Sequence, residues 1–220
     1  MLKLKSLEAL FVCILLCCSF NVQAFQPEEP LPWGGKISRA EECSHDETFV
    51  LAQGDGFIEC LRYFAAGLKK TNPVAILVME GDRDNDVNKS PHNIANNTPA
   101  LRTQYANTLL ARAHVPVVLL SRPGTFGSTG NHRHKRTLKE FAPISAAMDA
   151  LAQRYGIKRW VVVGHSGGGT AAAALLTLGR TDLECIVVTS GAFDLVERAN
   201  RYRQSRGLPI RPFTDLTGIV

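Results

Sequence analysis

Short apolar runs alternate with longer segments of helical spacing from residue 47 onward, and this alternation constrains the fold more than any other feature. Buried parallel strands read as continuous apolar runs, and a helix usually forms the crossover between two of them. The expected fold class is therefore α/β, with a mostly parallel sheet and helices on both faces. The expected strands are Val74–Met79, Val115–Leu120, Trp160–Val163 and Leu183–Thr189, and the expected helices are Thr98 or Pro99 to His114, Leu138–Tyr155, Gly167–Leu178 and Leu195–Ser205.

An antiparallel hairpin is expected before the first parallel strand. The runs Thr48–Ala52 and Gly56–Phe64 are separated by Gln53-Gly54-Asp55, which is a turn sequence. Residues 82–97 are acidic and rich in asparagine, so they are expected to form a loop. Since no repeat or linker divides the chain, residues 25–220 are interpreted as a single domain.

The first 24 residues have the pattern of a cleaved secretory signal peptide. Lys3 and Lys5 precede an apolar run from Ala9 to Phe20, and Val22-Gln23-Ala24 supplies the small residues of a cleavage site after Ala24. The predicted location is therefore secreted or periplasmic, with no stable membrane anchor. A retained N-terminal anchor is the alternative interpretation.

Cleavage of the signal peptide would change the number of cysteines and leave the remaining ones in an oxidising compartment. Three of the six lie in the predicted signal peptide, which leaves Cys43, Cys60 and Cys185. Cys43 and Cys60 would close a loop of about 17 residues, and such a disulfide contributes roughly 3 kcal/mol of stability. Cys185 lies in an apolar run and is predicted to be a buried thiol, although three free thiols remain the alternative. No Cys/His spacing typical of a metal site occurs, and no cofactor is expected.

One motif carries chemistry: Gly164-His165-Ser166-Gly167-Gly168, between an expected strand and an alanine-rich helix. A G-x-S-x-G sequence in this context forms a sharp turn that exposes the serine hydroxyl in a strained conformation. Gly164 and Gly168 would be small because the strand and helix cross closely there. The helix start directs backbone N–H groups towards the serine, so the Gly167 N–H can stabilise an oxyanion.

Two other motif interpretations fail on spacing and position. A phosphate-binding P-loop needs Lys-Ser/Thr after its last glycine, whereas Gly169 is followed by Thr170-Ala171. A dinucleotide fingerprint is loosely matched by Gly167–Ala172, but it belongs after the first strand of its unit and this segment follows a late one.

With this motif and strand order, the sequence resembles the α/β-hydrolase family, most closely its prolyl-oligopeptidase-type and related esterase branches. The resemblance spans about residues 47 to 195 and includes the loop that begins Arg122-Pro123-Gly124. It implies that Ser166 is the nucleophile. It also implies a second oxyanion donor after the strand Val74–Met79, where many members carry His-Gly. Here the residues are Glu80-Gly81-Asp82, so the candidate donor is a backbone N–H near Gly81 or Asp82, and Gly167 is the better supported donor.

The same resemblance implies an acid and then a histidine after the serine. Asp194 is the candidate acid and Asp215 a weaker one, although Asp194 is equally placed to cap a helix, and that interpretation is favoured. No histidine follows Ser166, since the six lie at positions 45, 92, 114, 132, 134 and 165. His132 and His134 are predicted to lie in a solvated loop and His165 to point away from Ser166. No general base is assigned, and the chain is predicted to be a C-terminally incomplete hydrolase.

The predicted function is a secreted or periplasmic serine hydrolase acting on a small-molecule ester or peptide substrate. The alternative is a catalytically incompetent remnant or a non-catalytic binding protein. A net charge of +5 is mild, and the arginines of Leu195–Ser205 are interpreted as one solvated helix face, so no nucleic-acid partner is predicted.

Overall fold

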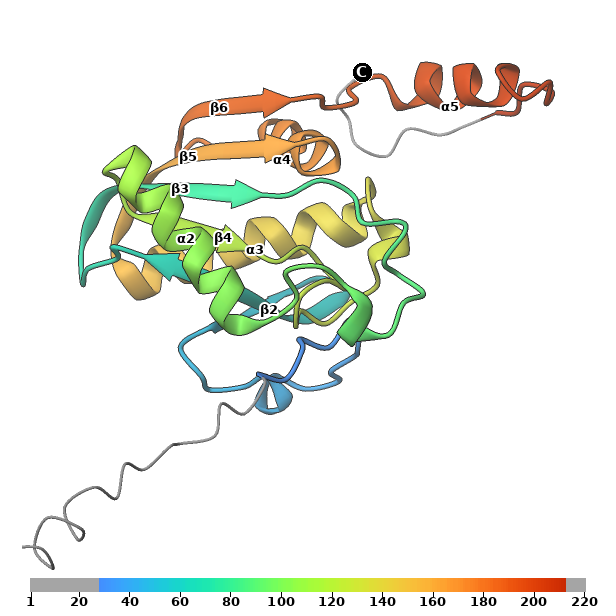
Figure 1. Cartoon of the computed structure of the whole chain (residues 1–220). Helices are drawn as coiled ribbons and strands as arrows, with labels where there is room; N and C mark the ends of the chain where they lie inside the picture. Colours follow the sequence, from blue (N-terminus) through green and yellow to red (C-terminus); the bar gives the residue numbers. More distant parts are fainter. Residues whose placement is uncertain (1–27, 213–220) are drawn as a thin grey trace, which may run out of the picture.

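The computed structural model describes residues 28–212, which form a six-stranded mixed sheet with helices on both faces (Figure 1). The strand order is β1-β2-β4-β3-β5-β6. The first two pairs are antiparallel and the other three are parallel. The predicted α/β class and the hairpin are confirmed. The strands are β1 (Phe49–Gly54), β2 (Phe57–Ala66), β3 (Asn72–Met79), β4 (Val117–Leu120), β5 (Ile157–His165) and β6 (Leu183–Thr189).

The helices bury the two faces of the sheet separately. Helix α2 (Pro99–Ala113) packs against β2 and β4, whereas α3 (Leu138–Tyr155) and α4 (Gly167–Thr177) cover the opposite face. Alternation along β4 shows this division, because Val118 and Leu120 join the α3/α4 core and Val117 and Leu119 join the α2 core. Helix α5 (Leu195–Gln204) projects beyond β6, away from the sheet (Figure 1).

Local signals explain where the helices begin and end. Thr98 caps α2 by accepting a hydrogen bond from the Leu101 N–H, and Pro99 occupies the first turn, where its missing N–H costs nothing. The C-cap residues that follow α2 and α3, His114 and Gly156, both adopt the left-handed conformation that commonly ends helices. These caps set where α2 begins, at the end of the loop that follows β3, and where α2 and α3 turn back towards the amino ends of β4 and β5.

Strand β6 is an edge strand, and its exposure corrects one prediction. The Cys185 thiol is exposed, so the expectation of a buried thiol is wrong. Ile186 and Val188 pack against the core beneath α4, but the alternate residues Cys185 and Val187 face away from it. An apolar run predicts burial on both faces, whereas the described residues cover only one face of β6.

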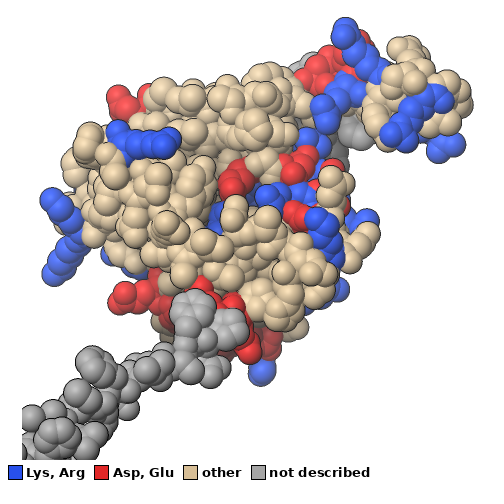
Figure 2. Space-filling view, viewed as in Figure 1, with Lys and Arg blue, Asp and Glu red and all other residues tan. Residues whose placement is uncertain are grey.

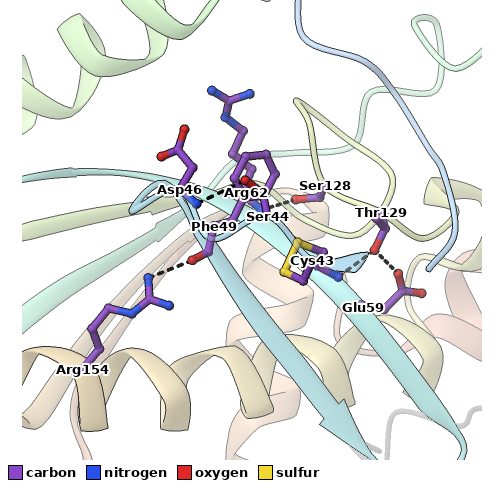
Figure 3. The surroundings of a disulfide bond; sticks show 10 residues. Cys43, Ser44, Asp46, Phe49, Glu59, Arg62, Ser128, Thr129 and Arg154 are labelled. Carbon is purple, nitrogen blue, oxygen red and sulfur yellow. Dashed lines mark hydrogen bonds between the residues drawn. A yellow bond between two sulfur atoms is a disulfide. The ribbon is translucent and has the colours of Figure 1, made fainter. Parts of the chain in front are cut away.

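Cys43 and Cys60 form a disulfide that joins the segment before β1 to β2 (Figure 3). Both residues are buried. The Cys60 N–H donates to Thr129 Oγ1 at 2.8 Å, and the Thr129 N–H donates back to the Cys60 carbonyl. The disulfide therefore fastens the N-terminal segment and the loop after β4 to the same point of the hairpin.

The described residues contain no helix that is long and apolar enough to cross a membrane. The predicted signal peptide, residues 1–24, lies outside the described residues, as does Asp215.

Candidate active site

Ser166 lies in the sharp turn between β5 and α4. Its backbone has φ 51° and ψ −119°, a conformation that a residue with a side chain adopts only when its surroundings enforce it. The Ser166 N–H donates to the Thr189 carbonyl at 2.7 Å, which anchors the turn to β6. This is the geometry in which a strand-to-helix turn presents a serine hydroxyl above the end of a sheet.

Two glycines allow α4 to approach the sheet this closely. A Cβ added to Gly164 would lie 2.3 Å from the Gly168 carbonyl oxygen, and one added to Gly168 would lie 2.4 Å from the Met79 carbonyl oxygen. Backbone atoms cannot move aside as a flexible side chain can, so both positions require glycine. The crossing point of strand and helix expected from the motif is therefore present.

The loop after β3 passes directly beside the serine. A Cβ added to Gly81 would lie 3.1 Å from Ser166 Cβ and 3.2 Å from His165 Cδ2. The start of α4 borders the same place, and the first N–H groups of a helix have no intrahelical acceptor. The structure thus brings Gly81, Asp82, Ser166 and Gly167 together.

Asp82 brings a carboxylate to this turn. A Cβ added to Gly167 would lie only 1.8 Å from Asp82 Oδ1, so the carboxylate oxygen occupies the space beside the Gly167 Cα. Its charge is compensated by two guanidinium groups, because Asp82 pairs with Arg122 at 3.1 Å and with Arg136. Figure 2 shows acidic and basic side chains side by side in a hollow at this end of the sheet.

Arg122 is buried and paired on both sides. Its side chain is 3% exposed, and its Nε donates to Glu140 Oε1 at 2.7 Å. Burial opposes its charge, but the carboxylates of Glu140 and Asp82 outweigh burial and raise the pKa of Arg122. Its Nη1 also donates to the Glu80 carbonyl at 3.2 Å. Arg122 therefore holds both the side chain and the main chain of the loop beside Ser166.

The histidines do not complete the site. His165 Nδ1 lies 2.9 Å from Thr189 Oγ1, so its ring is engaged away from the serine hydroxyl. His134 is exposed, but His132 is buried, which corrects its prediction as a solvated residue. The Arg83 N–H donates to His132 Nε2, and burial, followed by the charge of Arg122, lowers the pKa of His132 to about 4. Within residues 28–212, no hydrogen bond joins a histidine to Ser166.

Asp194 is the N-cap of α5. Its Oδ1 accepts the Glu197 N–H at 2.7 Å, and the side chain is exposed at the start of the projecting helix. The structure therefore places Asp194 in the capping role, and no contact links it to a histidine in the described part of the chain.

No sequence motif marks Arg122, Arg136 or Glu140 as parts of the site, so they were not among the predicted site residues. One signal was present: Arg122 directly follows a buried strand, and a buried guanidinium requires a carboxylate partner. The partners themselves come from distant segments, and no local pattern marks Glu140 among the exposed charges of α3.

No protein-family model matches the sequence, and no curated protein matches it. Solved structures do match. An esterase of Pyrococcus furiosus is 12% identical, with 86% of this chain and 71% of that chain covered and a TM-score of 0.51. A probable hydrolytic enzyme from Pseudomonas aeruginosa is 19% identical, with 86% and 63% covered and a TM-score of 0.46.

The mouse α/β hydrolase domain-containing protein 10 is also similar. It is 15% identical, with 74% of this chain and 55% of that chain covered and a TM-score of 0.47. The chain thus spans less than two thirds of the length of the Pseudomonas and mouse proteins. This chain has the α/β-hydrolase fold. The strand order, the sharp turn at Ser166 between β5 and α4, and the match to the Pyrococcus structure all agree with it.

Proposed function

We propose that this protein is a serine hydrolase that cleaves an ester or peptide bond by acyl transfer through Ser166. The observation that carries the proposal is the backbone of Ser166, which is held at φ 51° between the Gly81 loop and the start of α4. Strain of this kind persists where the surrounding structure enforces it, and it clusters at reactive residues. The α/β-hydrolase fold supports the same assignment.

In the proposed reaction, Ser166 Oγ forms a bond to the substrate carbonyl carbon. The carbonyl oxygen becomes an oxyanion that accepts hydrogen bonds from the N–H of Gly167 and from the N–H of Gly81 or Asp82. The C–O or C–N bond then breaks, and the alcohol or amine leaves with the proton lost by the serine. Water hydrolyses the acyl-serine and restores the hydroxyl, so the atoms balance with water as the only co-substrate.

Slow turnover is expected from the described residues. A serine hydroxyl needs a base to accept its proton, and no histidine between residues 28 and 212 is hydrogen-bonded to Ser166. Where the catalytic base is removed from such a site, the oxyanion donors and substrate binding still accelerate the reaction by about 10³–10⁴ over water. Imidazole added to the solution can accept the proton in place of a histidine side chain.

A second candidate function is that of a non-catalytic binding protein. It is favoured because no histidine among residues 28–212 is hydrogen-bonded to Ser166 and because Asp194 caps α5. The described residues therefore do not form a Ser-His-Asp triad. This arrangement would suit a non-catalytic binding protein that retains the hydrolase scaffold. Such a protein would bind carbonyl compounds without forming a covalent adduct.

We also propose that the protein acts in a secreted or periplasmic location. The Cys43–Cys60 disulfide supports this proposal, since disulfides persist in oxidising compartments. Expression with residues 1–24 fused to a reporter enzyme tests it: export of the reporter is expected, and retention in the cytoplasm would contradict it.

Hydrolysis of p-nitrophenyl acetate separates the two functions. The native chain, Ser166→Ala and the control Ser205→Ala, which changes an exposed serine of the α5 C-terminus, are compared with increasing imidazole. A rate that rises with imidazole above the imidazole-only reaction is expected in the native and Ser205→Ala chains and is lost in Ser166→Ala. Equal rates in all three folded chains would contradict the serine hydrolase and support the binding protein.

A further inference from the structure

Four charged side chains form a closed ring next to the serine turn. Arg122 binds Glu140 on one side and Asp82 on the other, and Arg136 binds Asp82 through its guanidinium. The Arg136 backbone N–H closes the ring by donating to Glu140 Oε2 at 2.6 Å. The two positive and two negative charges cancel, so the ring as a whole is neutral.

The ring joins three segments that are distant in the sequence. Asp82 follows β3, Arg122 follows β4, and Arg136 directly precedes the N-cap of α3, whose first turn contains Glu140. Arg122 and Glu140 are 3% and 2% exposed, so water cannot replace either partner. Arg136 has φ 59°, an uncommon conformation for a residue with a side chain, and the ring holds both its N–H and its guanidinium.

This ring touches the proposed oxyanion site directly. Beside Gly167, a Cβ would meet Asp82 Oδ1 at 1.8 Å and Arg122 Nη1 at 2.9 Å. The same Nη1 donates to the Glu80 carbonyl, one residue before Gly81. The position of the Gly81 and Asp82 N–H groups relative to Ser166 therefore depends on Arg122.

Arg122 also has an electrostatic effect on the oxyanion site, because its positive charge compensates the Asp82 carboxylate. A carboxylate beside an oxyanion opposes its formation, and the opposition is strong where water is excluded. Asp82 is tolerated next to Ser166 because two guanidinium groups compensate it. Loss of Arg122 would both release the loop and leave Asp82 less compensated at the point where negative charge develops.

We propose that Arg122 is the positioning residue of the oxyanion site: it fixes the Glu80–Asp82 backbone beside Ser166 and compensates the Asp82 carboxylate. This role rests on the proposed serine hydrolase function. It predicts that the two substitutions are not additive. Removing the Asp82 charge must partly restore the reaction rate of Ser166 that is lost when Arg122 is replaced. A salt bridge with only a structural role can show such a repair in stability, but it predicts none in the reaction rate of Ser166 measured on folded chains.

The test compares Arg122→Met with Arg180→Met as a matched control. Arg180 is also a buried guanidinium, with a side chain 7% exposed and paired with Asp149 and Asp182, but it contacts neither Ser166 nor the β3 loop. Reaction of Ser166 with a fluorophosphonate probe is expected to slow about a hundredfold in Arg122→Met. Arg180→Met is expected to react at the native rate, and Arg122→Lys, which keeps the charge, at an intermediate rate.

The double variant Arg122→Met/Asp82→Asn tests the electrostatic half of the role. It is expected to recover about tenfold of the lost rate, since each tenfold corresponds to about 1.4 kcal/mol of restored transition-state stabilisation. A double variant as slow as Arg122→Met, or an equal fall in Arg180→Met, would overturn the proposal.

Amide hydrogen exchange tests the positioning half without any reactivity. In Arg122→Met the amides of residues 80–83 are expected to exchange about tenfold faster, while Arg180→Met leaves them unchanged. Unchanged exchange in Arg122→Met would overturn the positioning role, whether or not the probe reacts. If the native chain is not labelled at Ser166, the proposed function fails, and exchange still decides how the loop is held.

Discussion

Replacing Gly167 with alanine is a sharp probe of the packing beneath the serine turn. Gly167 begins α4 and lies outside the left-handed region, so alanine would ordinarily stabilise this position by up to about 1 kcal/mol. The structure predicts the opposite sign. The new methyl group would lie 1.8 Å from Asp82 Oδ1 and 2.5 Å from its Cγ.

The size of the stability loss follows from the displacement of the Asp82 side chain that the new methyl group requires. An oxygen and a methyl carbon need more than 3 Å between them, so Asp82 must retreat far enough to break its 3.1 Å contact with Arg122. Breaking a buried ion pair costs about 3–5 kcal/mol, and Asp82, which is 11% exposed, lies at the lower end of that range. We therefore expect Gly167→Ala to lose about 3 kcal/mol, which lowers Tm by roughly 6–12 °C in a chain of this size.

Urea unfolding with the disulfide intact measures this loss. The matched comparison is a cycle of Gly167→Ala, Asp82→Ala and the double variant. Because Asp82→Ala removes the clashing carboxylate, the double variant is expected to lose at least about 1 kcal/mol less than the sum of the single losses. Additive losses, or a Gly167→Ala chain as stable as the native one, would refute the placement of Asp82 against the turn.

Substitutions of Asp194, His132 and Cys185 each test one feature of the described structure. Asp194→Ala removes a helix cap and is expected to speed amide exchange in α5 about fivefold, equivalent to about 1 kcal/mol, without changing probe labelling of Ser166; slower labelling would give Asp194 a catalytic role. Burial, followed by the charge of Arg122, lowers the pKa of His132 to about 4. Between pH 6.5 and pH 4, His132 therefore takes up a proton only in the unfolded chain. The free energy of unfolding is expected to fall by up to about 3 kcal/mol as the pH is lowered through that window. Urea unfolding of His132→Gln should lack this part of the decline, and equal pH slopes in the two chains would contradict the burial. In a chain without residues 1–24, Cys185 is expected to react with a chromogenic thiol reagent under native conditions, and Cys185→Ser to abolish the reaction; a signal only after unfolding would contradict its exposure.

Much of the fold could be predicted from the sequence because its signals are local. The boundaries of α3 at Leu138–Tyr155 and of β6 at Leu183–Thr189 agree with the expected ones, since spacing and turn residues mark them directly. The exposure of Cys185 could not be predicted in this way. An apolar run gives the composition of a strand, whereas exposure depends on whether another segment covers each face.

The residues of the candidate site also differ in whether a local sequence pattern could reveal them. Ser166 and its glycines are adjacent in sequence, so a motif reveals them. The ring of Asp82, Arg122, Arg136 and Glu140 is assembled from segments that follow β3, follow β4 and surround the start of α3, and His132, which is also buried, lies in a segment between them. Charged residues in loops are usually solvated, and only the folded chain shows that these ones are not.

Mass spectrometry of the chain after fluorophosphonate treatment identifies the reactive residue, which we expect to be Ser166. We expect one phosphonyl adduct per folded chain, located on the peptide that contains Ser166 and absent after denaturation before treatment. An adduct on another residue, or a folded chain that remains unmodified, would contradict the assignment of this protein as a serine hydrolase.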